Sequence, residues 1–135
     1  MPHALTAADL AESCARLGAD GAQLLTFFGA DERARTGQFA LYVAFLRRDG
    51  STDVLRTEVD PIAARYPSVT PALPAAHWDE RELADMLGVI PEGHPDARPL
   101  VRRPDWPQDV FPLRKDFDPS ALPPASRALE SRTGS

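Results

Sequence analysis

The side chains best suited to chemistry lie between positions 77 and 94 of this 135-residue chain. Glu82 and Asp85 are three residues apart, so on a helix they would share one face, as paired carboxylates do in acid–base or metal sites. His94 stands between Gly93 and Pro95, where a tight turn could present its imidazole for proton transfer. These residues are therefore the first candidates for a catalytic or metal-binding site.

The same residues also fit a structural role, which we favour. Acidic side chains around Arg81 are typical of a solvated or ion-paired helix face, and Arg81 can pair with Asp85 one turn later. The three histidines, His77 among them, show no paired metal-ligand spacing, and a turn histidine such as His94 usually holds its loop by hydrogen bonds. We therefore predict no catalytic, cofactor-binding or metal-binding residue in this chain.

The remaining composition argues against several classes of function. No glycine-rich phosphate loop, Gly-x-Ser-x-Gly elbow or Ser/His/Asp pattern occurs, and a formal net charge of −5 gives no electrostatic basis for binding nucleic acid. Cys14 is the one cysteine, so this chain by itself forms neither a disulfide nor a thiolate metal or iron–sulfur site, and we predict a buried thiol. We also expect no signal peptide and no membrane span, hence a cytoplasmic protein that reaches a membrane only through partners.

A single helix would position the candidate residues, and we predict it over residues 74–87. Pro74 suits a first helical turn, and Gly88 is the residue that commonly follows a helix C-terminus. Apolar residues recur on one side of this helix at Leu83, Met86 and Leu87. A helix with both an apolar stripe and many charges packs against another surface, either of its own domain or of a partner.

The first sixty residues predict a helix followed by a β-meander. Thr6 and Asp9 form an N-cap signal, and a helix over residues 7–17 would place Cys14 on its apolar side. Strand-forming residues follow in three runs, over 23–28 (ended by Gly29), 39–46 and 53–59, with Asp49-Gly50 as a hairpin turn. The predicted fold class is therefore α+β: an N-terminal helix, then an antiparallel three- to four-stranded sheet with helices on one face.

Proline dominates the second half of the chain. Thirteen of the fourteen prolines lie from Pro61 onward, so we predict no regular sheet there, with a helical turn at residues 62–66. A long Pro-rich arm over about residues 89–117 would lie along a surface. Its apolar anchors would be Trp106, Val110, Phe111 and Leu113. We expect one domain, residues 1–117, followed by a mobile Pro/Ser/Ala-rich tail, residues 118–135.

Five blocks of this sequence occur in an order that resembles a known family. They are Tyr66-Pro67-Ser68, Ala75-Ala76-His77-Trp78-Asp79-Glu80-Arg81-Glu82, Asp85-Met86-Leu87-Gly88, Gly93-His94-Pro95-Asp96 and Pro112-Leu113-Arg114-Lys115-Asp116-Phe117. Over about residues 20–117 the chain resembles the respiratory-chain NADH dehydrogenase 30 kDa subunit family, which includes the C subunit of NADH-quinone oxidoreductase (complex I). Leu87 replaces an aromatic residue usual in complex I, and residues 106–111 are similar to the branch in membrane-bound group 4 nickel–iron hydrogenases and formate hydrogenlyase.

The resemblance implies an α+β subunit of a peripheral arm, without a cofactor of its own. Iron–sulfur clusters and nickel–iron or quinone would belong to the partners, a hydrogenase-like large subunit of the complex I 49 kDa type and a small iron–sulfur subunit. Membrane subunits would be contacted indirectly, at the cytoplasmic face of the membrane. The implied family signature and subunit interface consist of Trp78, Glu80, Arg81, Glu82, Asp85, Gly88, Gly93, His94, Pro95, Pro112, Leu113, Arg114, Lys115 and Asp116.

We therefore expect a non-catalytic subunit of an energy-converting hydrogenase or formate hydrogenlyase, which binds and stabilises the catalytic large subunit through residues 77–117. Arg81 and Arg114 would fix the orientation of the two chains. The apolar anchors buried partly between the two chains would be Trp78, Trp106, Phe111 and Phe117. The alternatives are the 30 kDa-type C subunit of complex I itself, a non-respiratory binding module, and a small enzyme that uses His94 and Glu82.

Overall fold

The computed structural model of this chain describes residues 2–96 and 111–116. The predicted residues Trp106, Val110 and Phe117 and the tail 118–135 lie outside the described residues. The elements in chain order are β1 (His3–Leu5), α1 (Ala7–Ala19), β2 (Gln23–Glu32), α2 (Arg33–Thr36), β3 (Gln38–Leu46), β4 (Thr52–Val59), β5 (Arg65–Pro67), η1 (Pro74–Ala76), α3 (His77–Leu87) and β6 (Ile90–Glu92).

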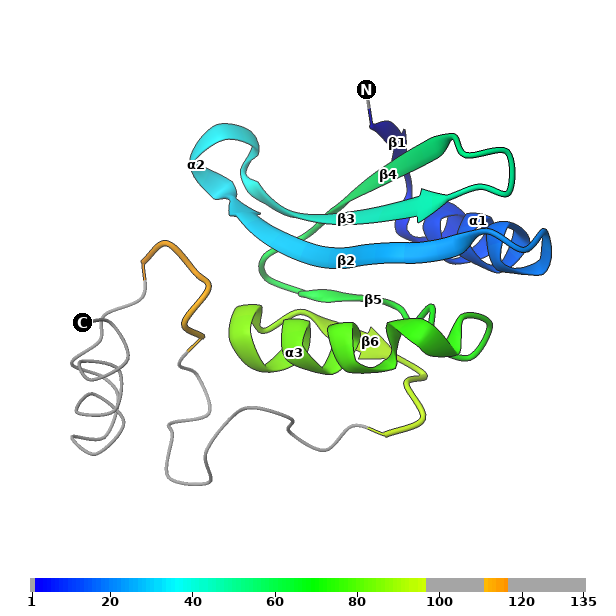
Figure 1. The fold of residues 1–135 in the computed structure, drawn as a ribbon. Coiled ribbons are helices and arrows are strands. Elements are labelled where there is room, and N and C mark those ends of the chain that lie inside the picture. Colours follow the sequence, from blue (N-terminus) through cyan, green and yellow to red (C-terminus); the bar gives the residue numbers. More distant parts are fainter. Residues whose placement is uncertain (1, 97–110, 117–135) are drawn as a thin grey trace, which may run out of the picture.

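The main sheet has four strands in the order β1-β4-β3-β2 (Figure 1). The predicted meander forms its antiparallel part, because β3 pairs with both β2 and β4. The hairpin at Asp49-Gly50 is present, with Gly50 at φ 88° and its N–H donating to the Arg47 carbonyl at 3.0 Å. The short β1 joins β4 in parallel, which the sequence did not predict, so the sheet is mixed. The α+β fold class is confirmed.

Two helices, α1 and α3, lie on the same side of this sheet (Figure 1). The N-cap of α1 is as predicted, since Thr6 Oγ1 accepts the N–H of Asp9 at 3.2 Å. Alternate residues of β3 face the helices, and the buried core joins strand and helix side chains: Phe39, Leu41, Val43 and Phe45 of β3, Leu10, Cys14 and Leu17 of α1, and Leu83 and Leu87 of α3. Burial of this apolar area is what holds the helices to the sheet.

The second strand runs past Gly29, where the sequence predicted its end. A Cβ at Gly29 would lie 2.3 Å from Leu83 Cδ1 and 2.8 Å from Leu87 Cδ2, so α3 approaches the strand backbone at this point. Glycine inside the strand therefore marks close helix packing and not a terminus. The prediction of a strand over 23–28 was too short, because β2 continues to Glu32.

The Pro-rich half contains a small sheet, which corrects the prediction of no regular sheet there. β5 and β6 pair in parallel, with Tyr66 opposite Pro91. Each strand has three residues and a single neighbour, so proline costs no bond that a central strand would need. The helical turn expected at 62–66 is a turn that ends at Ala64, where the chain enters β5. The predicted helix over 74–87 is present as η1 followed by α3, and Gly88 ends it with φ 81°.

Candidate functional site

Glu80 is the most deeply buried charged residue of the predicted signature, with no exposed surface. Its carboxylate accepts hydrogen bonds from Tyr66 Oη at 2.7 Å, Ser68 Oγ at 2.6 Å, Val69 N at 3.1 Å and Thr70 N at 3.0 Å, and also from Thr70 Oγ1. A carboxylate offers about four lone-pair sites, so these five donors occupy it. Glu80 thus fastens the 66–70 segment to α3.

Burial, and then the charge of Glu80, raise the pKa of two neighbouring side chains. Burial, together with the charge of Glu80, raises the pKa of Tyr66 well above its usual value. Burial and, to a lesser extent, Glu80 raise the pKa of Cys14 to about 12. Tyr66 therefore keeps its proton and donates it to Glu80 in a hydrogen bond, and Cys14 remains a thiol packed in the core, as predicted.

Arg81 and Asp85 are buried on another side of α3, with 8% and 6% of their surfaces exposed. Arg81 Nη1 lies 3.5 Å from Asp96 Oδ2, and its guanidinium stands 5.2 Å from the centre of the Trp78 ring. Of the two alternatives predicted for this face, solvated or ion-paired, the solvated one is wrong for Glu80, Arg81 and Asp85, which are buried, whereas Arg81 is ion-paired, with Asp96. The solvated alternative failed because Asp96 and the 66–70 segment fold over the helix, which helical spacing alone does not show.

His94 uses both ring nitrogens within the chain. Nδ1 accepts the backbone N–H of Asp96 at 2.9 Å, and Nε2 lies 3.2 Å from the carbonyl oxygen of His77. Since the Asp96 amide can only donate, the proton must sit on Nε2, which donates to the carbonyl. His94 lines a hollow of about 260 Å³ together with Arg81, Ala84, Asp85, Ile90, Pro91 and Asp96. This environment matches the interpretation of His94 as a structural turn histidine.

The Pro-Leu-Arg-Lys-Asp block folds back onto the end of α3. The Leu113 N–H donates to the Met86 carbonyl at 2.7 Å, and Arg114 Nε donates to the Leu87 carbonyl at 2.8 Å. These carbonyls belong to the last turn of the helix, whose oxygens have no partner inside the helix. The guanidinium of Arg114 lies over Phe111 at 4.4 Å and Phe39 at 5.0 Å. Arg114, predicted at the interface between chains, therefore caps a helix of its own chain.

Gly88 meets two requirements at this junction. Its φ of 81° is a left-handed conformation that favours glycine. A Cβ there would lie 2.7 Å from Arg114 Nη2 and 2.9 Å from Phe111 Cδ2. The glycine of the signature thus allows both the helix stop and the close approach of residues 111–114.

Asp31, which the sequence did not single out, connects this block to β2. Its carboxylate accepts Arg33 Nε at 2.9 Å, Arg33 Nη2 at 2.7 Å and the backbone N–H of Lys115 at 2.8 Å. Arg33 Nη2 also lies 2.9 Å from Asp116 Oδ1. The bonds from Arg33 and Lys115 outweigh burial and hold the pKa of Asp31 well below its usual range. The one sequence feature that could have indicated this role of Asp31 is its position shortly after an apolar run that predicts a strand.

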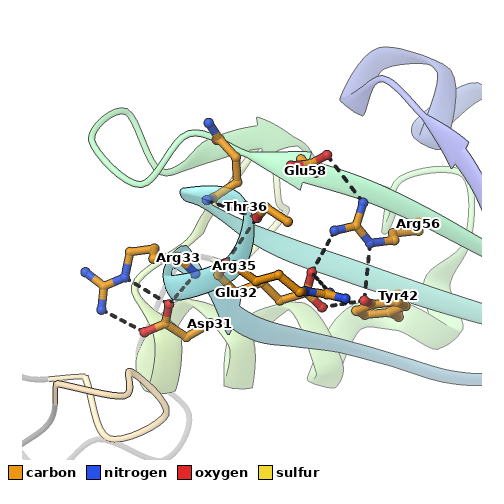
Figure 2. A network of polar contacts seen from close by, with 9 residues as sticks. Asp31, Glu32, Arg33, Arg35, Thr36, Tyr42, Arg56 and Glu58 are labelled. Atoms are coloured by element: carbon orange, nitrogen blue, oxygen red, sulfur yellow. Dashed lines mark hydrogen bonds and ion pairs between the residues drawn. The ribbon is translucent and has the colours of Figure 1, made fainter.

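A second polar network, also missed, spans the face of the sheet opposite the helices. Figure 2 shows Glu32 between Arg35, Tyr42 and Arg56. Its Oε1 accepts Arg35 at 2.7 Å and Arg56 at 2.6 Å, and its Oε2 accepts the Tyr42 hydroxyl. Although burial raises the pKa of Glu32, the bonds from Tyr42, Arg56 and Arg35 outweigh it and lower the pKa to about 2. This network joins β2, β3 and β4 across their outer face.

The other predicted signature residues remain at the surface. Trp78 and Leu113 expose 58% and 48% of their surfaces. Pro112 is half-buried, while the remaining members of the predicted set are exposed, namely Glu82, Gly93, Pro95, Lys115 and Asp116. Within residues 2–96 and 111–116, no three His, Cys, Asp or Glu side chains group as metal ligands do. No helix in the described part is long and apolar enough to cross a membrane.

Comparisons with known proteins give consistent matches. Residues 4–122 match the family model described as respiratory-chain NADH dehydrogenase, 30 Kd subunit. Formate hydrogenlyase subunit 5 of Escherichia coli K12 is 48% identical over 71% of this chain, and hydrogenase-4 component G of the same strain is 49% identical over 69%. The chain spans 17% of the length of each of these two relatives. The NADH-quinone oxidoreductase C subunit of Neorickettsia sennetsu is 34% identical over 82% of this chain and 59% of its own.

Solved structures share the fold. A trypsin-resistant fragment of Nqo5 matches with a TM-score of 0.62 and 29% identity, over 69% of this chain and 79% of the fragment. A chain of the membrane-bound sulfane sulfur reductase, an archaeal respiratory membrane complex, matches with a TM-score of 0.71 and 21% identity, over 98% of this chain and 76% of that one. At this lower identity the second match shows the fold alone.

Proposed function

The chain belongs to the respiratory-chain NADH dehydrogenase 30 kDa subunit family, and we propose that it is a non-catalytic peripheral subunit of a complex I-like, membrane-bound oxidoreductase. Its identity to formate hydrogenlyase subunit 5 and hydrogenase-4 component G exceeds its identity to the Neorickettsia protein, in agreement with the expected hydrogenase branch. In this role the chain binds and stabilises a hydrogenase-like large subunit, beside a small iron–sulfur subunit. Iron–sulfur clusters and nickel–iron or quinone would then reside in those partners, and the chain would reach the cytoplasmic face of the membrane through them.

The observation that carries this proposal is a contrast within and beside the signature, between buried charged side chains and exposed apolar ones. Glu80, Arg81 and Arg114 make their polar contacts within the chain, so these three residues stabilise α3 and the segments packed on it. The apolar residues beside them stay at the surface, where Trp78 and Ile90 expose 58% and 44% of their area. Half-exposed aromatic and aliphatic residues on a rigid element are typical of an interface. We define the Trp78 face as Trp78, Ile90, Pro91 and His94.

We propose that the large subunit docks on the Trp78 face. The Trp78 ring contacts two side chains of its own helix: the guanidinium of Arg81 lies 5.2 Å from its ring centre, and the His77 ring lies 4.9 Å away, edge to face. Such contacts fix the rotamer of an aromatic anchor, so little conformational entropy is lost on binding. The hollow of about 260 Å³ next to it offers space for a side chain of the partner.

A second candidate function is that of the C subunit of NADH-quinone oxidoreductase itself. It is favoured by the 34% identity to the C subunit of Neorickettsia sennetsu, which covers 82% of this chain. The two candidates differ in the partner and not in the docking mode. A small enzyme based on His94 and Glu82 is disfavoured, because both nitrogens of His94 are bound within the chain.

Affinity purification of the tagged full chain from membranes of its own host, in mild detergent, tests the proposal. The expected result is a stoichiometric large subunit identified by mass spectrometry. A nickel-binding large subunit assigns the hydrogenase branch, and co-purified NADH-binding subunits assign complex I. Recovery of the chain without any large subunit of either type would contradict the proposed function.

A further inference from the structure

A second surface lies on the other side of α3, between that helix and β2. It is a hollow of about 230 Å³ that we call the β2 groove, lined by Thr26, Phe27, Phe28 and Gly29 of β2, Asp79, Glu82 and Leu83 of α3, and Leu113. Phe27 and Leu83 are buried core residues, whereas Phe28 and Leu113 are each 48% exposed. The groove thus has an apolar base and one half-exposed apolar wall, Leu113, whereas the Phe28 side chain lies on the other face of the strand, stacked on Tyr42 with ring centres 5.1 Å apart.

Within residues 2–96 and 111–116, no strand pairs with the outer edge of β2, the strand that borders this groove. β2 is the terminal strand of the four-stranded sheet, and it is ten residues long. Among the residues that the structure describes, β3 is the one strand that pairs with it. An unpaired edge of this length presents backbone N–H and C=O groups to any extended segment that lies alongside.

The charge of the groove is one-sided. Asp79 and Glu82 stand three residues apart on α3, and none of the described residues that line the hollow is basic. No basic side chain in the described ranges forms an ion pair with either carboxylate. Burial, and then the charges of Glu82 and Glu80, raise the pKa of Asp79, as expected where acidic groups face each other without a cation. A segment with a lysine or arginine would complement this surface.

We propose that the β2 groove binds an extended, basic segment of the large partner subunit, which adds to the edge of β2 as a further strand. Because successive side chains of a strand point to opposite faces, one apolar side chain of that segment packs on Leu113 in the groove and the next packs on Phe28 on the other face, while a lysine or arginine reaches Asp79 and Glu82. Main-chain bonds to the edge provide affinity, while the contacts with Leu113 and Phe28 and the two carboxylates provide selectivity. The inference rests on the proposed function, because it names where a second contact with the same partner lies.

A photo-crosslinking experiment in the assembled complex tests the location. The tagged full chain carries p-benzoylphenylalanine in place of Phe28 and, as a matched control, in place of Ile62, which is 93% exposed on a turn. Irradiation should join position 28 to one segment of the large subunit, mapped by mass spectrometry to a stretch containing lysine or arginine, and position 62 should give no such adduct. The absence of any adduct between position 28 and the large subunit, or an adduct to another subunit in its place, would overturn the proposal.

The charge of the groove is tested separately. The double variant Asp79→Asn, Glu82→Gln should lower the amount of large subunit retained through a 0.3 M salt wash by a factor of about five. The control Glu12→Gln, which neutralises an exposed carboxylate on α1, should leave retention unchanged. Equal retention of the double variant and the wild type overturns the inference while the proposed function stands. Failure of the wild type to retain any large subunit removes the proposed function itself.

Discussion

Arg114 Nε donates to the carbonyl oxygen of Leu87 at 2.8 Å, so a residue near the end of the described chain closes the last turn of α3. The two residues are 27 positions apart. The guanidinium adds positive charge at the helix C-terminus, where the macrodipole is negative. Arg114, a signature residue expected at the interface with a partner, therefore also stabilises the fold of its own chain.

Replacing Arg114 with alanine should destabilise the isolated chain. Loss of the bond to Leu87 and of the contacts with Phe39 and Phe111 is expected to cost about 1.5–3 kcal/mol, as for other hydrogen bonds from charged groups. Urea denaturation followed by circular dichroism measures this. Lys115→Ala is the matched control, because Lys115 contributes its backbone N–H to Asp31, and it should change stability by less than about 0.5 kcal/mol. Equal effects of the two variants would argue against the capping role.

Gly88 should tolerate alanine worse than another glycine of the same conformation. Gly50 has φ 88° with nothing within 4 Å of an added Cβ, so Gly50→Ala should cost only the backbone strain, about 1 kcal/mol. Gly88→Ala adds the contacts with Arg114 and Phe111 and should cost at least about 2 kcal/mol. Thermal unfolding of both variants gives the comparison. A Gly88 variant as stable as the Gly50 variant would contradict the close packing of residues 111–114.

Glu80→Gln should be strongly destabilising although the side chain keeps its shape. The amide nitrogen can donate but not accept, so it would face the hydroxyl and N–H donors of the 66–70 segment. We expect a loss of about 2–3 kcal/mol, the cost of leaving buried donors unpaired. Glu82→Gln, on an exposed side of the same helix, should fall within about 0.5 kcal/mol of wild type. Chemical denaturation of both variants measures the difference, and equal stabilities would contradict the role of Glu80.

Stability should fall as the solution becomes acidic. Arg33 holds the pKa of folded Asp31 below its usual range, and Tyr42, Arg56 and Arg35 hold that of Glu32 at about 2 against an ordinary value of 4.5. A depressed folded-state pKa stabilises the protein above the unfolded value, and this contribution is lost as pH falls toward the folded value. The unfolding free energy should therefore decline between about pH 5 and pH 2. Glu32→Gln should flatten that decline, and an unchanged slope in this variant would count against the network.

The local elements could be predicted from the sequence because local signals define them. Thr6 and Asp9 capped the first helix, Asp49-Gly50 marked the hairpin, and Gly88 ended α3. Gly29 led to a wrong strand end, because a glycine is needed there for the close packing of Leu83 and Leu87. Those two residues lie more than fifty positions away in the sequence. The short β1 carries no alternating pattern, and it exists through its pairing with β4.

The sequence predicted which residues belong to the candidate site better than it predicted what each of them does. The family blocks identified Glu80, Arg81 and Arg114, but helical spacing gave no sign that they are bound by Thr70, Asp96 and Leu87. Asp31 was missed for the same reason, since its partner Lys115 is 84 residues away. Interactions between distant segments decide which charged residues are structural and which side chains remain at the surface.

Trp78 tests the central claim most directly, because it is the exposed aromatic on the face proposed to bind the large subunit. The measurement is the amount of large subunit that co-purifies with tagged Trp78→Ala, relative to wild type and to Ile62→Ala, after each variant is shown to fold by circular dichroism. We predict at least a tenfold loss for Trp78→Ala, as for a hot-spot residue, and no loss for Ile62→Ala. Full retention of the large subunit by folded Trp78→Ala would contradict docking on the Trp78 face.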